Sequence, residues 1–307
     1  MTPTRFTVAE QLRPIHRWAP RGYGFFYKLL LGKHYGDYPG DKELKRNLGQ
    51  RYRVFRDKNL GAYVCADLGD WASRAHYFKG IYYDRTVPLL IDHLLAGGGT
   101  FVDVGANRGM HTLHAAKVLG ARGHVYSYEP NPDTFDVLKA HLVMNQLRNC
   151  TPVNIGIADV TTELNLNLFS DDHSGTCSFI VSADVAKTVA VPVHPLDAVL
   201  DAASLIGPVL VKIDVEGYEH QVLKGMTNLL SRPDVTVICE LTDAWLRKTG
   251  SSVDAVVSDM AKHGYRMLLP QIRYRYWLKE IIELQPLDTP PLERQFDAVF
   301  VRTGDSN

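Results

Sequence analysis

Apolar positions from Thr100 onward alternate between short continuous runs and runs with helical spacing. Phe101–Val104 and Val125–Tyr128 are short apolar runs, and between them Met110–Leu119 carries apolar residues three and four positions apart. This alternation is typical of a parallel sheet with helices on both faces, so we predict an α/β, doubly wound fold. The predicted strands are 101–104, 125–128, 153–157, 209–213, 235–239, 265–269 and 296–301, and the predicted helices between them are 110–119, 132–142, 195–203, 218–230 and 252–263.

Two segments depart from this alternation. Residues 164–168 and 189–193 alternate apolar with polar or smaller residues, which predicts an inserted antiparallel β-hairpin. Nearer the start, 51–56 and 62–66 flank a turn-forming stretch and predict another hairpin. We divide the chain into an amino-terminal extension (1–60), a segment of hairpin and helix leading into the core (61–99), and the sheet domain (100–307).

Composition places the chain among globular proteins. Its 307 residues are 45% hydrophobic and 22% charged with a formal net charge of +0, which excludes a disordered, collagen-like or coiled-coil chain. No apolar run approaches the ~20 residues that would span a bilayer, and arginines interrupt residues 1–30 where a signal peptide would have its apolar core. We therefore expect a cytoplasmic protein with four reduced cysteines. The sequence leaves open whether it forms a homo-oligomer.

Charge is distributed unevenly along the chain. Residues 1–60 contain 13 Lys and Arg against 5 Asp and Glu, whereas residues 61–307 contain 21 against 29. A basic segment can bind phosphate or nucleic acid, and it can equally fold back on an acidic body. Both interpretations stay open at this point.

Acidic residues follow the carboxyl ends of five predicted strands. Asp103 ends the first strand and Glu129 the second, Asp159 follows the third, and Asp214 and Glu240 end the fourth and fifth. Ligands of open parallel sheets bind in the crevice outside these strand ends. Five acids along one edge therefore predict a ligand site there.

The turn after the first predicted strand separates two cofactor classes. It has glycines only at Gly105 and Gly109, and Asp103 precedes the first of them by two residues. A dinucleotide brings a pyrophosphate, which favours a turn with three glycines and is repelled by a carboxylate. S-adenosylmethionine carries a sulfonium and an ammonium group, both of which a carboxylate attracts. The acid therefore favours the methyl donor.

Three other residues fit the remaining parts of such a cofactor. Glu129 is placed to accept hydrogen bonds from two ribose hydroxyls, although this would serve a dinucleotide equally well. Asp159 could accept a hydrogen bond from an adenine amino group and Ile157 could pack on the ring. Simple turn formation is the alternative role for Asp159.

Three strings together resemble one family. They are V-D-V-G-A-N-R-G from Val102, Y-E-P-N-P from Tyr128 and K-I-D-V-E-G-Y-E from Lys212, and in this order and spacing they resemble the FkbM-type S-adenosylmethionine-dependent methyltransferases. The resemblance covers roughly Trp71 to Pro270, including Gly80–Tyr83 and Ser174–Ser178. It implies a Rossmann-like class I methyltransferase sheet of seven strands whose last strand is antiparallel, and O-methylation of a hydroxyl on a natural product, sugar or glycan.

The resemblance also implies a set of site residues. Asp214 and Glu216 would face the reacting centre, and Tyr82 or Tyr83 would face the donor. The residues implied for the donor site are Asp103, Gly105, Ala106, Asn107, Gly109, Glu129, Pro130, Asn131, Ile157, Asp159, Asp214 and Tyr82.

A hydroxyl acceptor must lose a proton, so a base is expected beside it. The candidates, in order of preference, are Asp214, Glu216, Glu240 and His173. Asp214 and Glu240 end adjacent predicted strands and could also hold Mg²⁺ together with water and substrate hydroxyls, although an Asp-Asp pair after the fifth strand is lacking.

Two alternatives to a small-molecule or glycan O-methyltransferase belong to other classes. A nucleic-acid methyltransferase would use the basic amino terminus, but the Asn/Asp-Pro-Pro-aromatic motif used on flipped bases does not follow the fourth predicted strand. A protein that binds S-adenosylmethionine without catalysis is the other alternative.

Overall fold

A computed structural model of the chain describes residues 52–80, 82, 84–169, 177–180, 185–275, 279–286 and 290–304. The chain divides into two compact units, one formed by Met1–Tyr83 with Ser170–Gly175 and the other by Asp84–Phe169 with Thr176–Asn307. Each unit is described by itself. Most of the predicted amino-terminal extension and His173 lie outside the described residues, and the division at residues 60 and 99 stays a prediction.

The first unit contains the predicted amino-terminal hairpin. Strands β1 (Tyr52–Arg56) and β2 (Tyr63–Asp67) pair antiparallel, which confirms the prediction. Helix α4 (Trp71–Lys79) follows, with the Asp70 side chain accepting a hydrogen bond from the Ser73 amide at its amino end. Buried His76 contacts Asp57 at 2.6 Å and so ties the helix to the hairpin turn.

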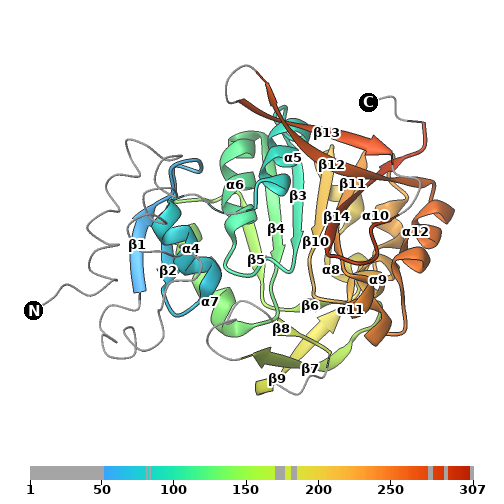
Figure 1. Cartoon of the computed structure of the whole chain (residues 1–307), viewed down its shortest axis with the longest axis horizontal. Helices are drawn as coiled ribbons and strands as arrows, with labels where there is room; N and C mark the ends of the chain where they lie inside the picture. Colours follow the sequence, from blue (N-terminus) through green and yellow to red (C-terminus); the bar gives the residue numbers. More distant parts are fainter. Residues whose placement is uncertain are drawn as a thin grey trace, which may run out of the picture. The chain divides into compact units, whose positions relative to one another are not determined.

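The second unit is built on one mixed sheet of eight strands in the order β13-β12-β14-β11-β10-β3-β4-β5 (Figure 1). The central strands are parallel, whereas β14 runs antiparallel to both β11 and β12. The predicted doubly wound sheet with an antiparallel last strand is therefore confirmed, with one strand more than predicted. The bounds are β3 Gly99–Val104, β4 Gly123–Tyr128, β5 Cys150–Val153, β10 Val209–Ile213, β11 Val235–Leu241, β12 Tyr265–Arg275, β13 Lys279–Pro286 and β14 Phe296–Arg302.

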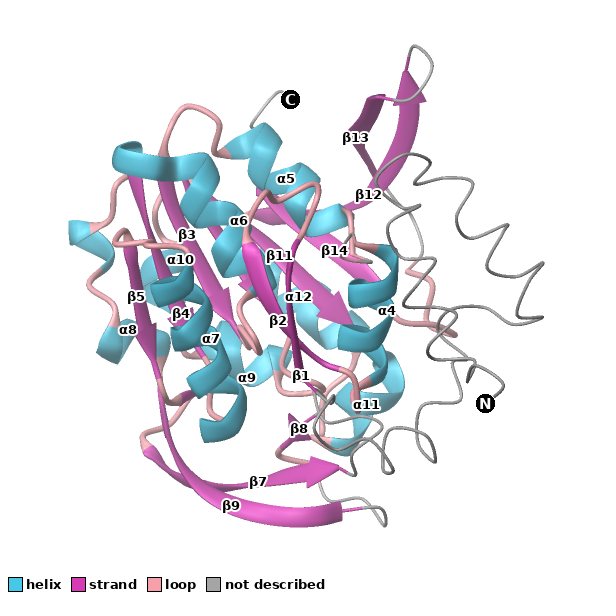
Figure 2. Ribbon diagram, turned by 90° about the vertical axis from the view of Figure 1, so that its left-hand side faces the viewer, coloured by secondary structure: helices cyan, strands magenta, loops and turns pink. Residues whose placement is uncertain are grey.

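Helices cover both faces of this sheet. On one face α5 (Thr86–Leu94) and α6 (Met110–Leu119) pack on the strands, with Ile91 and Leu119 fully buried. The opposite face is covered by side chains of α8, α9, α10, α11 and α12, and α7 packs beside β5 (Figure 2). Within the described residues, no helix combines the length and the apolar character needed to cross a membrane. The bounds of the helices named after α6 are α7 Pro132–Met144, α8 Leu196–Val199, α9 Glu219–Lys224, α10 Thr227–Leu230, α11 Asp243–Lys248 and α12 Val253–Lys262.

A smaller sheet has the order β6-β9-β7-β8. Its long strands β7 (Thr162–Phe169) and β9 (Val185–His194) pair antiparallel, which confirms the predicted inserted hairpin, and β6 (Gly156–Ile157) and β8 (Cys177–Ser178) complete it. Figures 1 and 2 both draw this sheet beyond the carboxyl ends of the parallel strands. It is therefore placed next to the edge where the sequence predicts a ligand.

The predicted third strand over 153–157 is wrong in its bounds, because two strands share this segment. Strand β5 ends at Val153 and pairs with β4, whereas β6 belongs to the smaller sheet. Between them the Asn154 side chain donates hydrogen bonds to the carbonyls of Glu129 and Pro130, at 2.7 and 3.1 Å. These bonds hold the chain at the break, so Asp159 does not follow a strand of the main sheet.

Other differences involve the later elements. The pattern predicted no strand between 265–269 and 296–301, yet β12 runs on to Arg275 and returns as β13. The predicted helix 218–230 is two helices, since the chain turns at Gly225, where a Cβ would lie 2.0 Å from the Ala158 carbonyl oxygen. The predicted helix 195–203 is reduced to the single turn of α8 and a 3-10 turn at Ala202–Ser204.

We predict that Gly225→Ala lowers the free energy of unfolding by about 1–3 kcal/mol, because the added methyl group must displace backbone. Gly97→Ala is the control, since a Cβ there meets nothing within 4 Å. Urea unfolding of both variants checks this. Equal stability of the two variants would show that the close approach of Gly225 to the Ala158 carbonyl does not restrict which residue fits at position 225.

Candidate active site at the carboxyl ends of the parallel strands

A layer of polar side chains continues the α5/α6 face of the sheet beyond its apolar core. Side chains alternate across a strand, so residues two positions after core residues point to the same face. Lys212 follows core residue Leu210 in this way, and register pairs Lys212 with Asp103 on the neighbouring strand. The members of this layer are Ser127 on β4, Asp103 on β3, Lys212 on β10, Glu240 on β11 and Asp297 on β14.

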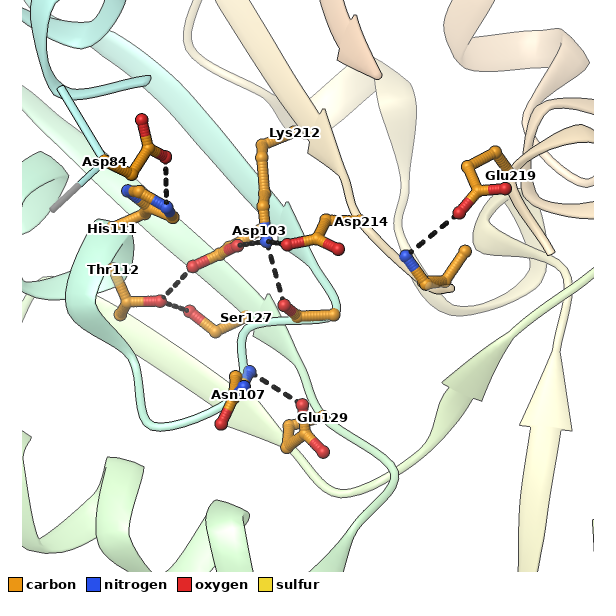
Figure 3. Close-up of polar contacts among 12 residues, drawn as sticks. Asp84, Asp103, Asn107, His111, Thr112, Ser127, Glu129, Lys212, Asp214 and Glu219 are labelled. Atoms are coloured by element: carbon orange, nitrogen blue, oxygen red, sulfur yellow. Dashed lines mark hydrogen bonds and ion pairs between the residues drawn. The ribbon is translucent and has the colours of Figure 1, made fainter. Parts of the chain in front are cut away.

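Lys212 is the centre of the layer (Figure 3). Its ammonium donates to the Gly105 carbonyl at 2.9 Å and lies 3.1 Å from a carboxylate oxygen of Asp214 and 3.6 Å from one of Asp103. Burial by itself would lower the pKa of Lys212, but the carboxylates of Asp214 and Asp103 outweigh it and raise the pKa above its ordinary value. Lys212 therefore remains charged although it is buried.

Asp103 is fully buried at the end of β3. One of its oxygens accepts a hydrogen bond from the Thr112 hydroxyl at 2.6 Å, and Thr112 in turn contacts the Ser127 hydroxyl at 2.8 Å. The other oxygen has no hydrogen-bond partner among the described residues and faces the Lys212 ammonium.

The turn after β3 brings backbone close to the turn after β10. Gly105 has φ +77°, and a Cβ there would lie 1.9 Å from the Asp214 carbonyl oxygen, so only glycine fits. The amides of Gly105 and Ala106 both donate to the Tyr128 carbonyl at 3.0 Å. Asn107 has φ +49°, and Gly109 (φ +79°) starts α6 against Leu138.

Glu129 directly follows β4 and is held by three hydrogen bonds. One oxygen accepts from the Asn107 amide at 2.7 Å, and the other from the Asn131 amide and the Thr134 hydroxyl, both at 2.9 Å. Burial raises the pKa of Glu129 to about 6, although these hydrogen bonds oppose the rise. The carboxylate is thus fixed in orientation, and Asn131 also caps α7.

Two further acids follow β10, half-buried Glu216 in the turn and buried Glu219 at the first position of α9. Glu219 accepts a hydrogen bond from the Gly217 amide at 2.9 Å, and Glu216 is a non-glycine residue at φ +53°. Burial, followed by the neighbouring acids, raises the pKa of Glu216 to about 7, and burial raises that of Glu219 to about 7. The Ser178 hydroxyl from β8 donates to the Glu216 carbonyl at 2.8 Å, so the smaller sheet supports this turn.

Cys177, also on β8, marks where the smaller sheet meets the crevice. Burial raises the pKa of its thiol, and the carboxylates of Glu129, Glu216 and Asp214 raise it further. Its thiol therefore lies within electrostatic reach of all three acids. The sequence indicated this residue only through its place in the family resemblance.

A second group of acids lies on the other side of Lys212. Glu240 and Asp297 occupy paired positions on β11 and β14, and Asp214 is adjacent to Glu240. Burial and then the Asp214 carboxylate raise the pKa of Glu240 well above its ordinary value, and burial, with Asp84 and Asp214, raises that of Asp297 to about 6. Burial and the neighbouring carboxylates thus make it unfavourable for Glu240 and Asp297 to be charged at the same time.

Asp84 and His111 border the second group and were not predicted from the sequence. His111 lies in the first turn of α6, and its Nε2 is 3.1 Å from a carboxylate oxygen of Asp84 (Figure 3). Burial tends to raise the pKa of Asp84, but the contact with His111 outweighs it and lowers the pKa below its ordinary value. The position of His111 two residues after Gly109 is the sequence signal that could have identified it.

The structure brings together most, but not all, of the predicted residues. Asp103, Glu129, Asp214, Glu216 and Glu240 lie around the crevice as the strand ends predicted. Ile157 is buried in the core cluster of the opposite face, and Asp159 is exposed in the turn after β6. Their contribution to the donor site, like that of Pro130, stays a prediction.

Tyr82 belongs to the first unit, where its ring lies 5.4 Å from that of His76. Its predicted role toward the donor stays a prediction. In the part of the chain that the structure describes, no three His, Cys, Asp or Glu side chains form a group that could hold a metal ion. The suggested Mg²⁺ site therefore has no support from the geometry.

Comparison with known proteins identifies relatives of this chain. A family model described as the methyltransferase FkbM domain matches residues 103–267. Hexuronic acid methyltransferase AglP of Haloferax volcanii is 31% identical over 139 residues, which are 44% of this chain and 53% of that protein. The match thus spans about half the length of this relative.

Solved structures with a similar fold include methyltransferase FkbM from Methylobacillus flagellatus, with 17% identity and a TM-score of 0.44, covering 87% of this chain and 61% of that one. An O-methyltransferase dependent on S-adenosylmethionine from Thermotoga maritima has 13% identity and a TM-score of 0.40, covering 74% of this chain and 68% of that one. The family model covers more than half of the chain and begins at Asp103, the first acid of the site. The chain therefore belongs to the FkbM methyltransferase family, as its three sequence motifs predicted.

Proposed function

We propose that this chain is an S-adenosylmethionine-dependent O-methyltransferase that acts on a hydroxyl group of a sugar or a related small molecule. The observation that carries the proposal is the gathering of buried and half-buried carboxylates around one buried ammonium at the carboxyl edge of the sheet. Burial raises the pKa values of Glu129, Glu216 and Asp297, because ionising these carboxylates in this place is unfavourable. A cationic ligand would reduce that cost.

The residues present fit S-adenosylmethionine. Glu129 would accept hydrogen bonds from the ribose hydroxyls, and the free oxygen of Asp103 would face the amino-acid part. When bound, the donor supplies a methyl group that its sulfonium already activates, so the protein has chiefly to orient the two reactants.

Glu240 is our candidate for the proton acceptor. Asp214, the residue preferred from the sequence, is already engaged by Lys212 at 3.1 Å and so serves better as an anchor. Glu240 adjoins Asp214, and positive charge brought to this edge of the sheet would lower the raised pKa of Glu240. A base whose pKa is near the working pH transfers protons most efficiently.

The acceptor class rests on two arguments. Carboxylates such as Glu240 and Asp297 accept hydrogen bonds from hydroxyl groups, and the relative AglP is named for action on a hexuronic acid. Nucleic acid is a poor fit, because the acids of this edge would repel a phosphate backbone. A protein that binds the donor without catalysis would bind it and release no methylated product.

Glu129→Gln should weaken S-adenosylmethionine binding about 10- to 100-fold, since hydrogen bonds to a charged acceptor are worth ~1.5–3 kcal/mol. Because the pKa of Glu129 is raised to about 6, wild-type affinity should fall as the pH drops through 6, where binding has to expel a proton. The variant should lack this fall. Calorimetry between pH 5 and 8 measures both effects, with exposed Glu163→Gln as control.

Should Glu129→Gln bind the donor with wild-type affinity at every pH, the ribose assignment is wrong.

Glu240→Gln should lower kcat by about 10²–10⁴-fold and change donor affinity by no more than about threefold, as expected for a lost base. Asp214→Asn should lower both, because it also removes a Lys212 contact. Single-turnover rates with labelled donor and a panel of sugars give the comparison, with exposed Glu293→Gln as control. A Glu240 variant with unchanged kcat would assign the proton to another group.

A further inference from the structure

Lys212 is the one residue of strand β10 that carries a charge. All five residues of this strand are buried, and one of them carries an ammonium group. Burying a charge is costly unless it is paired and hydrogen-bonded. Here the Lys212 ammonium donates to the Gly105 carbonyl and is paired with the carboxylates of Asp214, at 3.1 Å, and Asp103, at 3.6 Å.

The three partners come from separate pieces of the donor site. Asp103 ends β3, Gly105 forms the first turn, and Asp214 starts the turn after β10. The Gly105 turn also approaches the Asp214 backbone so closely that no side chain fits between them. One side chain thus connects both turns that border the crevice.

Lys212 also sets the charge of the site. With Asp103 and Asp214 it forms a group of two negative charges and one positive charge, which leaves one net negative charge to meet the donor. Without the ammonium, the buried Asp103 carboxylate and the partly exposed Asp214 carboxylate would lose the cation that both contact, and neighbouring like charges disfavour joint ionisation. The other charged or titratable groups around it are Asp84 before α5, His111 on α6, Glu129 after β4, Glu216 and Glu219 after β10, Glu240 on β11 and Asp297 on β14.

We propose that Lys212 is a positioning residue of the donor site, which holds the Asp103 and Asp214 carboxylates on either side of its ammonium and fixes the Gly105 turn, so that this edge of the sheet offers a net negative charge to the sulfonium. This inference rests on the proposed function. It assigns Lys212 a role in positioning the donor site, and another residue accepts the proton of the methyl acceptor. A purely structural lysine would connect the turns but would not determine how the site distinguishes a charged donor from a neutral product.

The test compares S-adenosylmethionine with S-adenosylhomocysteine, which has the same ribose and adenine but a neutral thioether. Because Glu129 faces the part they share, its titration affects both ligands and cancels in the ratio of their affinities. In Lys212→Met one carboxylate takes up a proton at low pH and releases it at high pH. In Lys212→Met, the ratio of the affinity for S-adenosylmethionine to that for S-adenosylhomocysteine should therefore rise between pH 6 and 9 by about tenfold more than in the wild type. One pKa unit corresponds to a tenfold change in equilibrium.

Two further variants separate charge from structure. Lys212→Arg keeps the charge, so its ratio should follow the wild-type pH profile even if both affinities fall. The double variant Lys212→Met/Asp214→Asn leaves Asp103 as the single carboxylate of this group. Its affinity ratio should therefore not show the additional rise with pH that is expected of Lys212→Met. If Lys212→Met instead weakens both ligands by one factor at every pH, the lysine is only structural and the inference is overturned.

A second measurement needs no ligand. In urea, the unliganded Lys212→Met protein should lose stability more steeply than the wild type between pH 6 and 9, and the double variant should be more stable than Lys212→Met. A double variant that is no more stable than the single one contradicts the inference, and this holds even if Lys212→Met does not fold. If no variant and no wild-type protein binds S-adenosylmethionine, the proposed function fails, while the unfolding data still decide on the role of Lys212.

Discussion

A buried ammonium between two carboxylates is the constraint on which this site depends. Lys212 sits in a strand that is otherwise apolar, and its ammonium is stabilised there by Asp103, Asp214 and the Gly105 carbonyl. Each partner belongs to a different turn or strand end, so satisfying the one charge fixes their relative positions. The apolar core below supports the layer, since the same strands contribute Phe101 and Leu210 to the packing under α5 and α6.

The acids around this group exceed the positive charge that they enclose. Burial raises the pKa values of Glu129, Glu216, Glu219, Glu240 and Asp297, which means that their ionisation is less favourable here than in water. A cation at this edge would make their ionisation more favourable, whereas a pyrophosphate would increase the repulsion. This electrostatic argument separates a methyl donor from a dinucleotide on a fold that accommodates both.

Local sequence patterns predicted the elements whose signals lie within a few residues. The short apolar strands and the period-two hairpin were confirmed because each reflects its own immediate neighbours. Four of the five acids predicted at strand ends, Asp103, Glu129, Asp214 and Glu240, lie at the ends of strands of the main sheet for the same reason. Strand β13 was missed because it is defined by pairing with the far part of β12, and Asp159 was misplaced because the bonds of Asn154 end β5 early.

The site contacts that sequence reasoning missed are those made between distant segments. Lys212 meets Asp103 only through the register of β10 on β3, and Asp84 meets His111 only after α5 and α6 have packed. Neither pairing has a spacing rule that a single sequence could reveal. The family resemblance did contain Lys212 in its third motif, but a motif gives a position and not a contact.

The central claim is that these carboxylates select a positively charged methyl carrier, and equilibrium dialysis of the wild-type chain against S-adenosylmethionine and NAD⁺ at one pH and one salt concentration tests it most directly. The account predicts saturable binding of one S-adenosylmethionine molecule per chain that NAD⁺ does not displace at tenfold excess. Binding of NAD⁺ as tight as that of S-adenosylmethionine would contradict it.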